Sequence, residues 1–236
     1  MTLSKIYGFN KCSEMGNDLL APCIFLAGCN LRCPYCMNHK LVDQFALKEV
    51  DINVIKDYVL KEKSKWFMIS GGEPTCNSTE ELINLIKTVK EWGCKIGMAT
   101  NGTNKSILSE LLPYLNYVAM DIKSSRDKIY HNIGCTNGLF NVIYSKCILA
   151  SEKYKRDDFD YEIRTTLFPE FVNREDVKEI GTLLRKDDKW VLQRFRATAP
   201  VIFRNQVNTI SYTDEEVNEL LKIAKNYSDN VVVKYV

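Results

Sequence analysis

The chain has 236 residues, of which 45% are hydrophobic and 26% charged, a composition typical of soluble globular domains and not of collagens, coiled-coil rods or disordered tails. Its 32 basic and 30 acidic residues leave a net charge of +2, too balanced to predict a nucleic-acid surface. No apolar run approaches the ~18 residues that span a bilayer. The first residues also lack the apolar core of a signal peptide, so we expect a cytoplasmic protein without a membrane anchor.

Six short apolar runs follow one another along the chain, each with the near-continuous hydrophobicity of a strand buried on both faces of a parallel sheet. They cover 23–26, 66–69, 96–99, 117–120, 161–166 and 190–195. Patterns with apolar residues three and four apart lie between and after these runs and predict amphipathic helices. The helical patterns cover 52–59, 82–89, 103–112, 139–150, 177–184 and 217–224.

Polar residues predict where several of these helices begin. Ser78 with Glu81, and Thr213 with Glu216, have the spacing of capping boxes, in which each member satisfies a backbone N–H of the first turn. Further N-cap residues are expected at Asp51, Asn137 and Asn173.

The alternation of strands and helices predicts an α/β fold, a partial, open (β/α)6 barrel with parallel strands. Successive strands start 21 to 44 residues apart, close to the ~30 residues of a βαβ unit. We expect a single domain over 1–236 with its core at about 21–200. An N-terminal extension covers 1–20, and a C-terminal helix and edge strand lie within 213–236.

The densest chemical feature is the run Cys29, Cys33 and Cys36, a C-x3-C-x2-C spacing in the loop after the first strand. Three thiolates so close in sequence can hold a cubane [4Fe-4S] cluster. Electron-transfer clusters of this kind use four cysteines, so one iron would remain open to a substrate. His39 follows Cys36 by three residues, so a structural Cys3His zinc site in a binding module is the alternative.

The other six cysteines have no metal-ligand spacing, and their setting in a long chain without an export signal argues against disulfides. We expect these thiols to be buried as small hydrophobic groups. They are Cys12, Cys23, Cys76, Cys94, Cys135 and Cys147.

Polar residues and glycines stand near the carboxyl ends of the other strands, where parallel α/β folds bind ligands. They are Gly71, Gly72, Glu73, Thr100, Asn101, Asp121, Lys123, Arg164 and Gln193. Glu73 can accept from an ammonium group, and Arg164 can clamp a carboxylate. Thr100 and Asp121 offer oxygen atoms to ribose hydroxyls or a small cation. With the aromatic face of Tyr35, these groups predict a pocket for a zwitterionic amino acid that carries a sugar and a base.

The pattern Cys29-x3-Cys33-x-Tyr35-Cys36, followed by Gly71-Gly72-Glu73-Pro74, resembles the radical S-adenosylmethionine superfamily. This resemblance implies a [4Fe-4S] cluster on the three cysteines. It also implies bound S-adenosyl-L-methionine, whose amino and carboxylate groups chelate the open iron and whose reductive cleavage yields a 5′-deoxyadenosyl radical. The segments 118–123, 161–166 and 191–195 are most similar to activating proteins of glycyl radical enzymes, of the short anaerobic ribonucleoside-triphosphate reductase type.

The resemblance also implies roles for individual residues. Tyr35 would pack on the adenine, Glu73 would lie near the amino group, and Arg164 would contact the carboxylate, with Asp121 and Lys123 contacting the cofactor. The catalytic and metal-binding residues are Cys29, Cys33 and Cys36. The implied cofactor-binding residues are Tyr35, Met37, Gly71, Gly72, Glu73, Thr100, Asn101, Asp121, Lys123, Arg164 and Gln193.

The activity implied is that of an anaerobic oxidoreductase that generates a glycyl radical on a partner enzyme. The expected partner is an anaerobic ribonucleotide reductase, and the expected electron donor is a flavodoxin or ferredoxin. A radical enzyme of the same superfamily that acts on a small molecule, a peptide or a modified nucleoside is the second interpretation.

Overall fold

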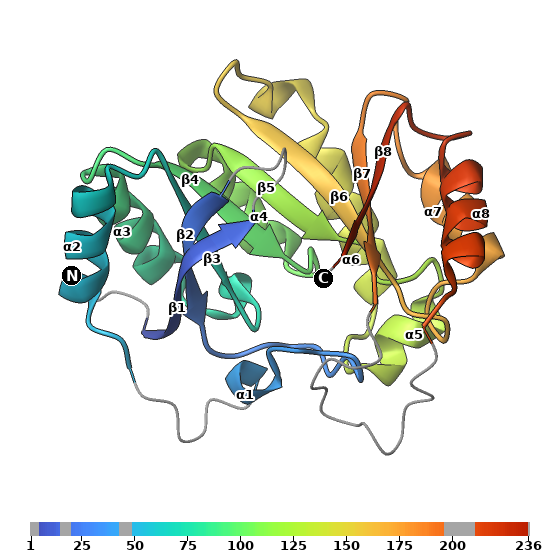
Figure 1. The fold of residues 1–236 in the computed structure, drawn as a ribbon, viewed down its shortest axis with the longest axis horizontal. Helices are drawn as coiled ribbons and strands as arrows, with labels where there is room; N and C mark the ends of the chain where they lie inside the picture. The colour runs from blue at the N-terminus through green and yellow to red at the C-terminus, as the bar shows by residue number, and fades with distance from the viewer. Residues whose placement is uncertain (1–4, 15–19, 43–48, 196–210, 236) are drawn as a thin grey trace.

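The computed structural model describes residues 5–14, 20–42, 49–195 and 211–235, and in this part of the chain it shows one curved eight-stranded sheet (Figure 1). The strands lie side by side in the order in which they follow one another along the chain. Their bounds are β1 Ile6–Glu14, β2 Leu20–Leu26, β3 Trp66–Gly71, β4 Lys95–Thr100, β5 Tyr117–Asp121, β6 Asp160–Leu167, β7 Lys189–Arg194 and β8 Asn230–Tyr235.

Strands β2 to β8 pair in parallel, and β1 pairs antiparallel with β2. The predicted open α/β barrel is confirmed: all six predicted strands are present, and the expected C-terminal edge strand is β8. Strand β1 was not predicted. It lies in the expected N-terminal extension, and its mixed sequence of polar and apolar residues has no clean alternation that would reveal it.

Helices connect the parallel strands, and those over each predicted pattern are confirmed. The bounds are α1 His39–Val42, α2 Ile52–Glu62, α3 Thr79–Lys90, α4 Lys105–Leu111, α5 Asp127–Asn132, α6 Gly138–Leu149, α7 Arg174–Thr182 and α8 Asp214–Ala224, with short 3-10 turns at η2 Pro74–Cys76, η3 Leu112–Tyr114 and η4 Glu152–Tyr154. In the described part of the chain, none of these helices has the length and apolar character needed to cross a membrane.

Three of the predicted helix starts have the expected side-chain caps. Thr213 and Glu216 form a capping box at α8, and Asn173 forms one with Asp176 at α7. Asp51 caps α2 by accepting a hydrogen bond from the backbone N–H two residues later. These caps anchor helices whose apolar faces cover the sheet.

Two other cap predictions need correction. Ser78 is the N-cap residue of α3, but its side chain makes no cap hydrogen bond; Glu80 and Glu81 place negative charge at the positive end of the helix instead. Asn137 is the N-cap residue of α6 and has a left-handed conformation with φ 58°. Its backbone carbonyl accepts from Asn141 N at 3.0 Å, but its side chain makes no cap hydrogen bond.

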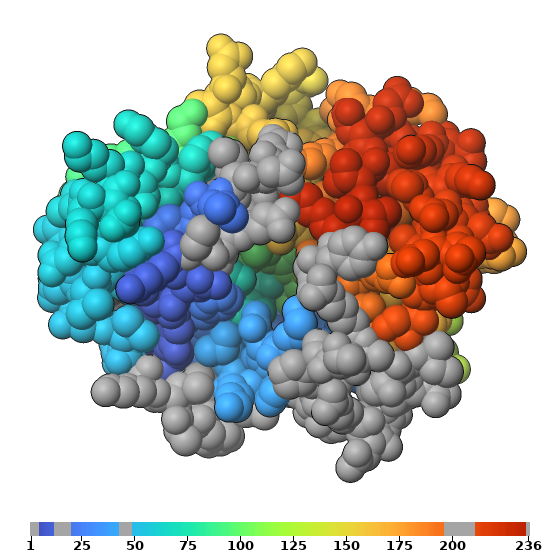
Figure 2. All heavy atoms as spheres, viewed as in Figure 1, coloured from blue at the N-terminus to red at the C-terminus, as the bar shows by residue number. Residues whose placement is uncertain are grey.

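The sheet has different packing on its two faces. The main core lies between the sheet and the helices, whereas the concave face holds a small cluster of Ala21, Cys23, Met68, Tyr117 and Ala119. Figure 2 shows the opening of this face, with the middle of the chain visible between the blue N-terminal and red C-terminal parts.

The six scattered cysteines do not share one environment. Two are buried as predicted, namely Cys23 and Cys94. The prediction is wrong for three others, because turns and an outer helix face leave them exposed or half-buried: Cys76, Cys135 and Cys147. The side chain of Cys12 lies outside the described part.

Candidate cofactor-binding site

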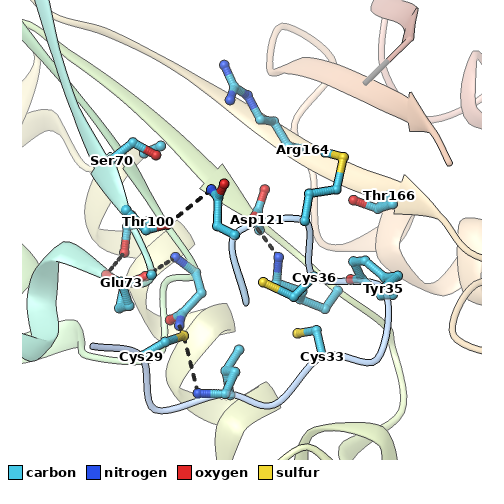
Figure 3. A pocket seen from close by; sticks show the side chains of 18 of the residues that line it. Cys29, Cys33, Tyr35, Cys36, Ser70, Glu73, Thr100, Asp121, Arg164 and Thr166 are labelled. Atoms are coloured by element: carbon cyan, nitrogen blue, oxygen red, sulfur yellow. Dashed lines mark hydrogen bonds and ion pairs between the residues drawn. The ribbon is translucent and has the colours of Figure 1, made fainter. Parts of the chain in front are cut away.

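A cavity of about 240 Å³ lies at the carboxyl ends of the parallel strands, and every residue of the predicted metal-binding and cofactor-binding sets lines it. Figure 3 looks into this cavity, with the three cysteines on one side of the view and Arg164 and Thr166 on the other. The structure therefore brings together residues that are more than 160 positions apart in the sequence, from Cys29 to Gln193.

The loop after β2 carries the three cysteines into the cavity. Backbone hydrogen bonds tie this loop down, from Gly28 N to Leu41 O at 2.7 Å and from Arg32 N to Ile133 O at 2.8 Å. Cys33 is 7% exposed, and the other two cysteines are half-buried. The thiols thus belong to a loop fixed at two points on neighbouring segments.

Burial is the largest influence on these thiols and raises their pKa values, to about 12 for Cys29 and about 11 for Cys33. It also raises the pKa of Cys36. Thiols in such surroundings keep their protons unless a cation compensates the thiolate charge, and an iron–sulfur cluster binds cysteine in the thiolate form. Three thiols that line one cavity fit the expected cluster in number and chemistry.

The zinc alternative has no support from the geometry. Among the described residues, no group of three or more His, Cys, Asp or Glu side chains could hold a metal ion. His39 begins α1 and does not line the cavity. A four-iron cluster is larger than one ion, so its ligands need not converge on one point.

His39→Ala is expected to leave the iron content of the anaerobically reconstituted protein unchanged, because His39 lies outside the set of cavity residues. Iron and sulfide analysis, with zinc measured in the same samples, checks this. If the substitution removes one bound zinc per chain, the zinc-module interpretation is correct and the cluster assignment is wrong.

Two glycines bring the end of β3 against the loop after β2. Gly71 has φ 144°, and a Cβ atom there would lie 2.1 Å from the carbonyl oxygen of Leu26. A Cβ atom on Gly72 would lie 2.2 Å from the carbonyl oxygen of Gly28. Hydrogen bonds from Gly72 N to Leu26 O and from Glu73 N to Gly28 O, at 3.0 and 2.7 Å, hold this contact. Only glycine fits this close approach.

Glu73 links the ends of β3 and β4. It is 1% exposed, and its Oε1 accepts from Thr75 N, Thr75 Oγ1 and Thr100 Oγ1 at 3.0, 2.7 and 2.7 Å. Its Oε2 accepts from Asn101 N at 2.6 Å. Burial raises the pKa of Glu73, against the effect of these donors. Because Oε2 receives one donor, it retains capacity for an ammonium group in the cavity.

Tyr35 and an ion pair form the wall beside the cysteines. Asp121 Oδ2 and Lys123 Nζ lie 2.6 Å apart, and Lys123 Nζ lies 5.9 Å from the centre of the Tyr35 ring. Tyr35 packs against Phe168 and Phe171 at centroid distances of 5.0 and 5.3 Å. Its hydroxyl is buried and has no hydrogen-bond partner among the described residues, so it is available to a bound ligand.

Arg164 has a protein partner that the sequence analysis did not identify. Its Nε donates to Glu162 Oε1 at 2.6 Å, and Lys189 Nζ lies 3.2 Å from Glu162 Oε2. Glu162 is 1% exposed; burial opposes its charge, but the two cations bring its pKa below the usual value. In the described part of the chain this bond uses Nε, one of the five guanidinium donors, so other donors of Arg164 can bind a carboxylate in the cavity.

The cavity has six lining residues that the sequence analysis missed: Leu31, Asn38, Ser70, Ala99, Thr166 and Phe195. Strand periodicity could have found two of them, because Thr166 and Phe195 stand two residues after Arg164 and Gln193 and share their faces. Thr166 Oγ1 donates to Gln193 Oε1 at 3.3 Å. Asn38 Nδ2 donates to the backbone carbonyl of Gly71 in β3 at 3.3 Å, and no spacing in the sequence predicts this contact.

Comparisons with known proteins identify the family of the chain. Residues 23–184 match the profile of the Radical SAM superfamily. A Methanocaldococcus jannaschii protein, assigned as a glycyl-radical enzyme activating enzyme, is 30% identical over 218 residues, which are 89% of this chain and 87% of that protein. The pyruvate formate-lyase 1-activating enzyme of Escherichia coli is 26% identical over 146 residues, 57% of this chain and 58% of that one.

A solved structure shows the same fold. A domain of a pyruvate-formate lyase-activating enzyme from Bacteroides vulgatus superposes with a TM-score of 0.53 at 16% identity, covering 71% of this chain and 97% of that domain. The profile match spans well over half of the chain, including the cysteine loop and the glycines of β3. The chain therefore belongs to the radical SAM superfamily, whose cofactors are a [4Fe-4S] cluster and S-adenosylmethionine.

Proposed function

We propose that this protein is an activating enzyme that places a glycyl radical on a partner enzyme, and that the partner is an anaerobic ribonucleoside-triphosphate reductase. The observation that carries the activating role is the 30% identity to the M. jannaschii relative over 89% of the chain. The gathering of all predicted cofactor residues in one cavity supports it. The choice of partner rests on the sequence resemblance of the strand segments.

Cys29, Cys33 and Cys36 would hold the cluster, since they are the three thiols that line the cavity. When bound and reduced, the cluster and S-adenosylmethionine supply a 5′-deoxyadenosyl radical, which takes a hydrogen atom from a glycine Cα of the partner. The electron comes from a reduced flavodoxin or ferredoxin, and we place the reaction in the cytoplasm of anaerobic cells.

The remaining side chains orient the amino-acid part of the cofactor. The guanidinium of Arg164, whose Nε donates to Glu162, would bind the carboxylate, and Glu73 Oε2, which accepts from Asn101 N, would also accept from the ammonium group. Groups of opposite charge, one just after β3 and one on β6, would fix the direction of a zwitterion in the cavity. The ring of Tyr35, held by Phe168 and Phe171, offers an apolar face and a free hydroxyl to the nucleoside.

The test has two stages. Anaerobically reconstituted protein, reduced with dithionite and supplied with S-adenosylmethionine, should form 5′-deoxyadenosine. Addition of a purified anaerobic ribonucleotide reductase should then produce the doublet electron paramagnetic resonance signal of a glycyl radical. Absence of 5′-deoxyadenosine from protein with a full cluster overturns the whole proposal.

The second stage separates the activating role from other radical chemistry. If 5′-deoxyadenosine forms but no glycyl radical appears on the reductase or on a pyruvate formate-lyase, the substrate is a small molecule, a peptide or a modified nucleoside. A signal on pyruvate formate-lyase alone retains the activating role and corrects the partner.

Arg164→Ala is expected to weaken S-adenosylmethionine binding by about 1.5–3 kcal/mol, roughly 10- to 150-fold in Kd, because a charge-assisted bond to the carboxylate is lost. Equilibrium dialysis with the reconstituted protein measures this. The free energy of unfolding in urea is measured for the same variant, because the substitution removes one of the two cations that pair with the buried Glu162 and leaves Lys189 beside it. Arg174→Ala is the control, because Arg174 is exposed and pairs with Glu219 on α8. An unchanged Kd contradicts the assigned role.

A further inference from the structure

Three side chains form a closed ring of hydrogen bonds on the flank of Cys29. Asn30 Nδ2 donates to Thr103 Oγ1 at 2.8 Å, Thr103 Oγ1 donates to Asn101 Oδ1 at 2.7 Å, and Asn101 Nδ2 donates to Asn30 Oδ1 at 2.9 Å. The ring joins the cysteine loop to the segment after β4, since Asn30 and Thr103 are 73 positions apart in the sequence. Asn101 and Thr103 are buried.

The direction of every bond in this ring is determined. Thr103 N can act as a donor only, and it lies 3.0 Å from Asn101 Oδ1, so the oxygen of this amide must face Thr103. The hydroxyl of Thr103 has one hydrogen, which it gives to the same oxygen. It therefore accepts from Asn30, and the NH2 group of Asn101 must point toward the cysteine loop.

This orientation turns the Asn101 amide N–H toward the sulfur of Cys29, which also accepts from a backbone N–H of its own loop. Asn101 Nδ2 lies 4.0 Å from Cys29 Sγ, and Leu31 N lies 3.4 Å from it. The backbone of Asn101 is also fixed, because its N–H donates to the buried Glu73 at 2.6 Å. The amide is therefore held on both its backbone and its side chain, beside one of the three thiols that line the cavity.

We propose that Asn101 is a positioning residue that acts through Cys29 to raise the reduction potential of the cluster, with Thr103 and Asn30 holding its amide in place. Reduction adds negative charge, part of which resides on the cysteine sulfurs. A fixed N–H dipole stabilises that charge, so hydrogen bonds to the sulfurs make reduction easier. The inference depends on the cluster at Cys29 and does not depend on which partner receives the radical.

The experiment is a redox titration of the reconstituted protein without S-adenosylmethionine, followed by electron paramagnetic resonance of the reduced cluster. Asn101→Leu removes the amide at similar volume. It should lower the ratio of reduced to oxidised cluster at a fixed solution potential by about three- to tenfold, where tenfold corresponds to 59 mV for one electron. An unchanged or higher potential at full iron content overturns the inference.

A second variant keeps the test decisive if Asn101→Leu fails to hold iron. Thr103→Val retains the Asn101 amide and the Thr103 backbone N–H but breaks the ring at the hydroxyl, so it should shift the potential in the same direction by a smaller factor. Thr88→Val is the matched control, because Thr88 Oγ1 donates to a helix carbonyl within α3 at 2.8 Å. Equal potentials in Thr103→Val and Thr88→Val overturn the proposal.

Discussion

Cys33→Ala is expected to abolish both cluster assembly and S-adenosylmethionine cleavage. Cys33 is 7% exposed and is one of three thiols that line the cavity, so its loss leaves the cluster with two protein ligands. Cys76, whose Sγ lies 3.8 Å from Asn30 Oδ1, is not among the residues that line the cavity. Iron analysis and 5′-deoxyadenosine assay should both fall to background.

Cys147→Ala provides the comparison for this result. Cys147 is exposed on α6 and does not line the cavity, so the same substitution there should leave iron content and 5′-deoxyadenosine formation at the level of the unchanged protein. Full iron content and activity in Cys33→Ala would show that the ligands are assigned wrongly.

Gly72→Ala is expected to cost about 3 kcal/mol of folding free energy and to reduce cluster content, because its Cβ would lie 2.2 Å from the backbone oxygen of Gly28. The obstacle is backbone and cannot rotate away. Relief would require β3 to separate from the loop that leads to Cys29, whose Cβ lies 3.2 Å from the same position. Urea unfolding of the apoprotein and iron analysis after reconstitution measure the two effects separately.

Gly93→Ala separates steric conflict from backbone strain. Gly93 has φ 88°, and no heavy atom lies within 4 Å of the position that a Cβ atom would take there, so alanine should cost only the ~1 kcal/mol of a left-handed conformation. Iron content should remain normal. If both variants lose the same stability and Gly72→Ala keeps its cluster, the close approach at Gly72 is not what positions the cysteine loop.

The strands and most helices could be predicted because the sequence pattern that favours each one lies within the element itself or next to it. Parallel strands buried on both faces are continuous apolar runs, and helix starts such as Thr213 and Asn173 carry their capping partners three residues away. The grouping of the candidate residues in one cavity was predictable for a related reason: parallel strands present their carboxyl ends at one edge, so side chains at those ends lie close together.

The features that escaped prediction depend on pairing across the chain. Strand β1 is defined by its antiparallel register with β2, which its own sequence does not encode as an alternating pattern. The contact of Asn30 with Thr103 requires two loops to meet, and neither residue type is unusual in a loop. The pairing of Arg164 with Glu162, by contrast, could have been predicted, since residues two apart in a strand lie on the same face.

The reversed direction of β1 has a practical consequence for the protein in the laboratory. Ile6 pairs with Leu26 at the carboxyl edge of the sheet, and Lys234 pairs with Gln193 at that same edge. A bulky group attached near Ile6 or Lys234 would therefore lie at the edge of the sheet where the cavity opens. The turn at 151–159 precedes β6 and lies at the far edge (Figure 1), where a fluorescent label or surface tether would leave the mouth clear.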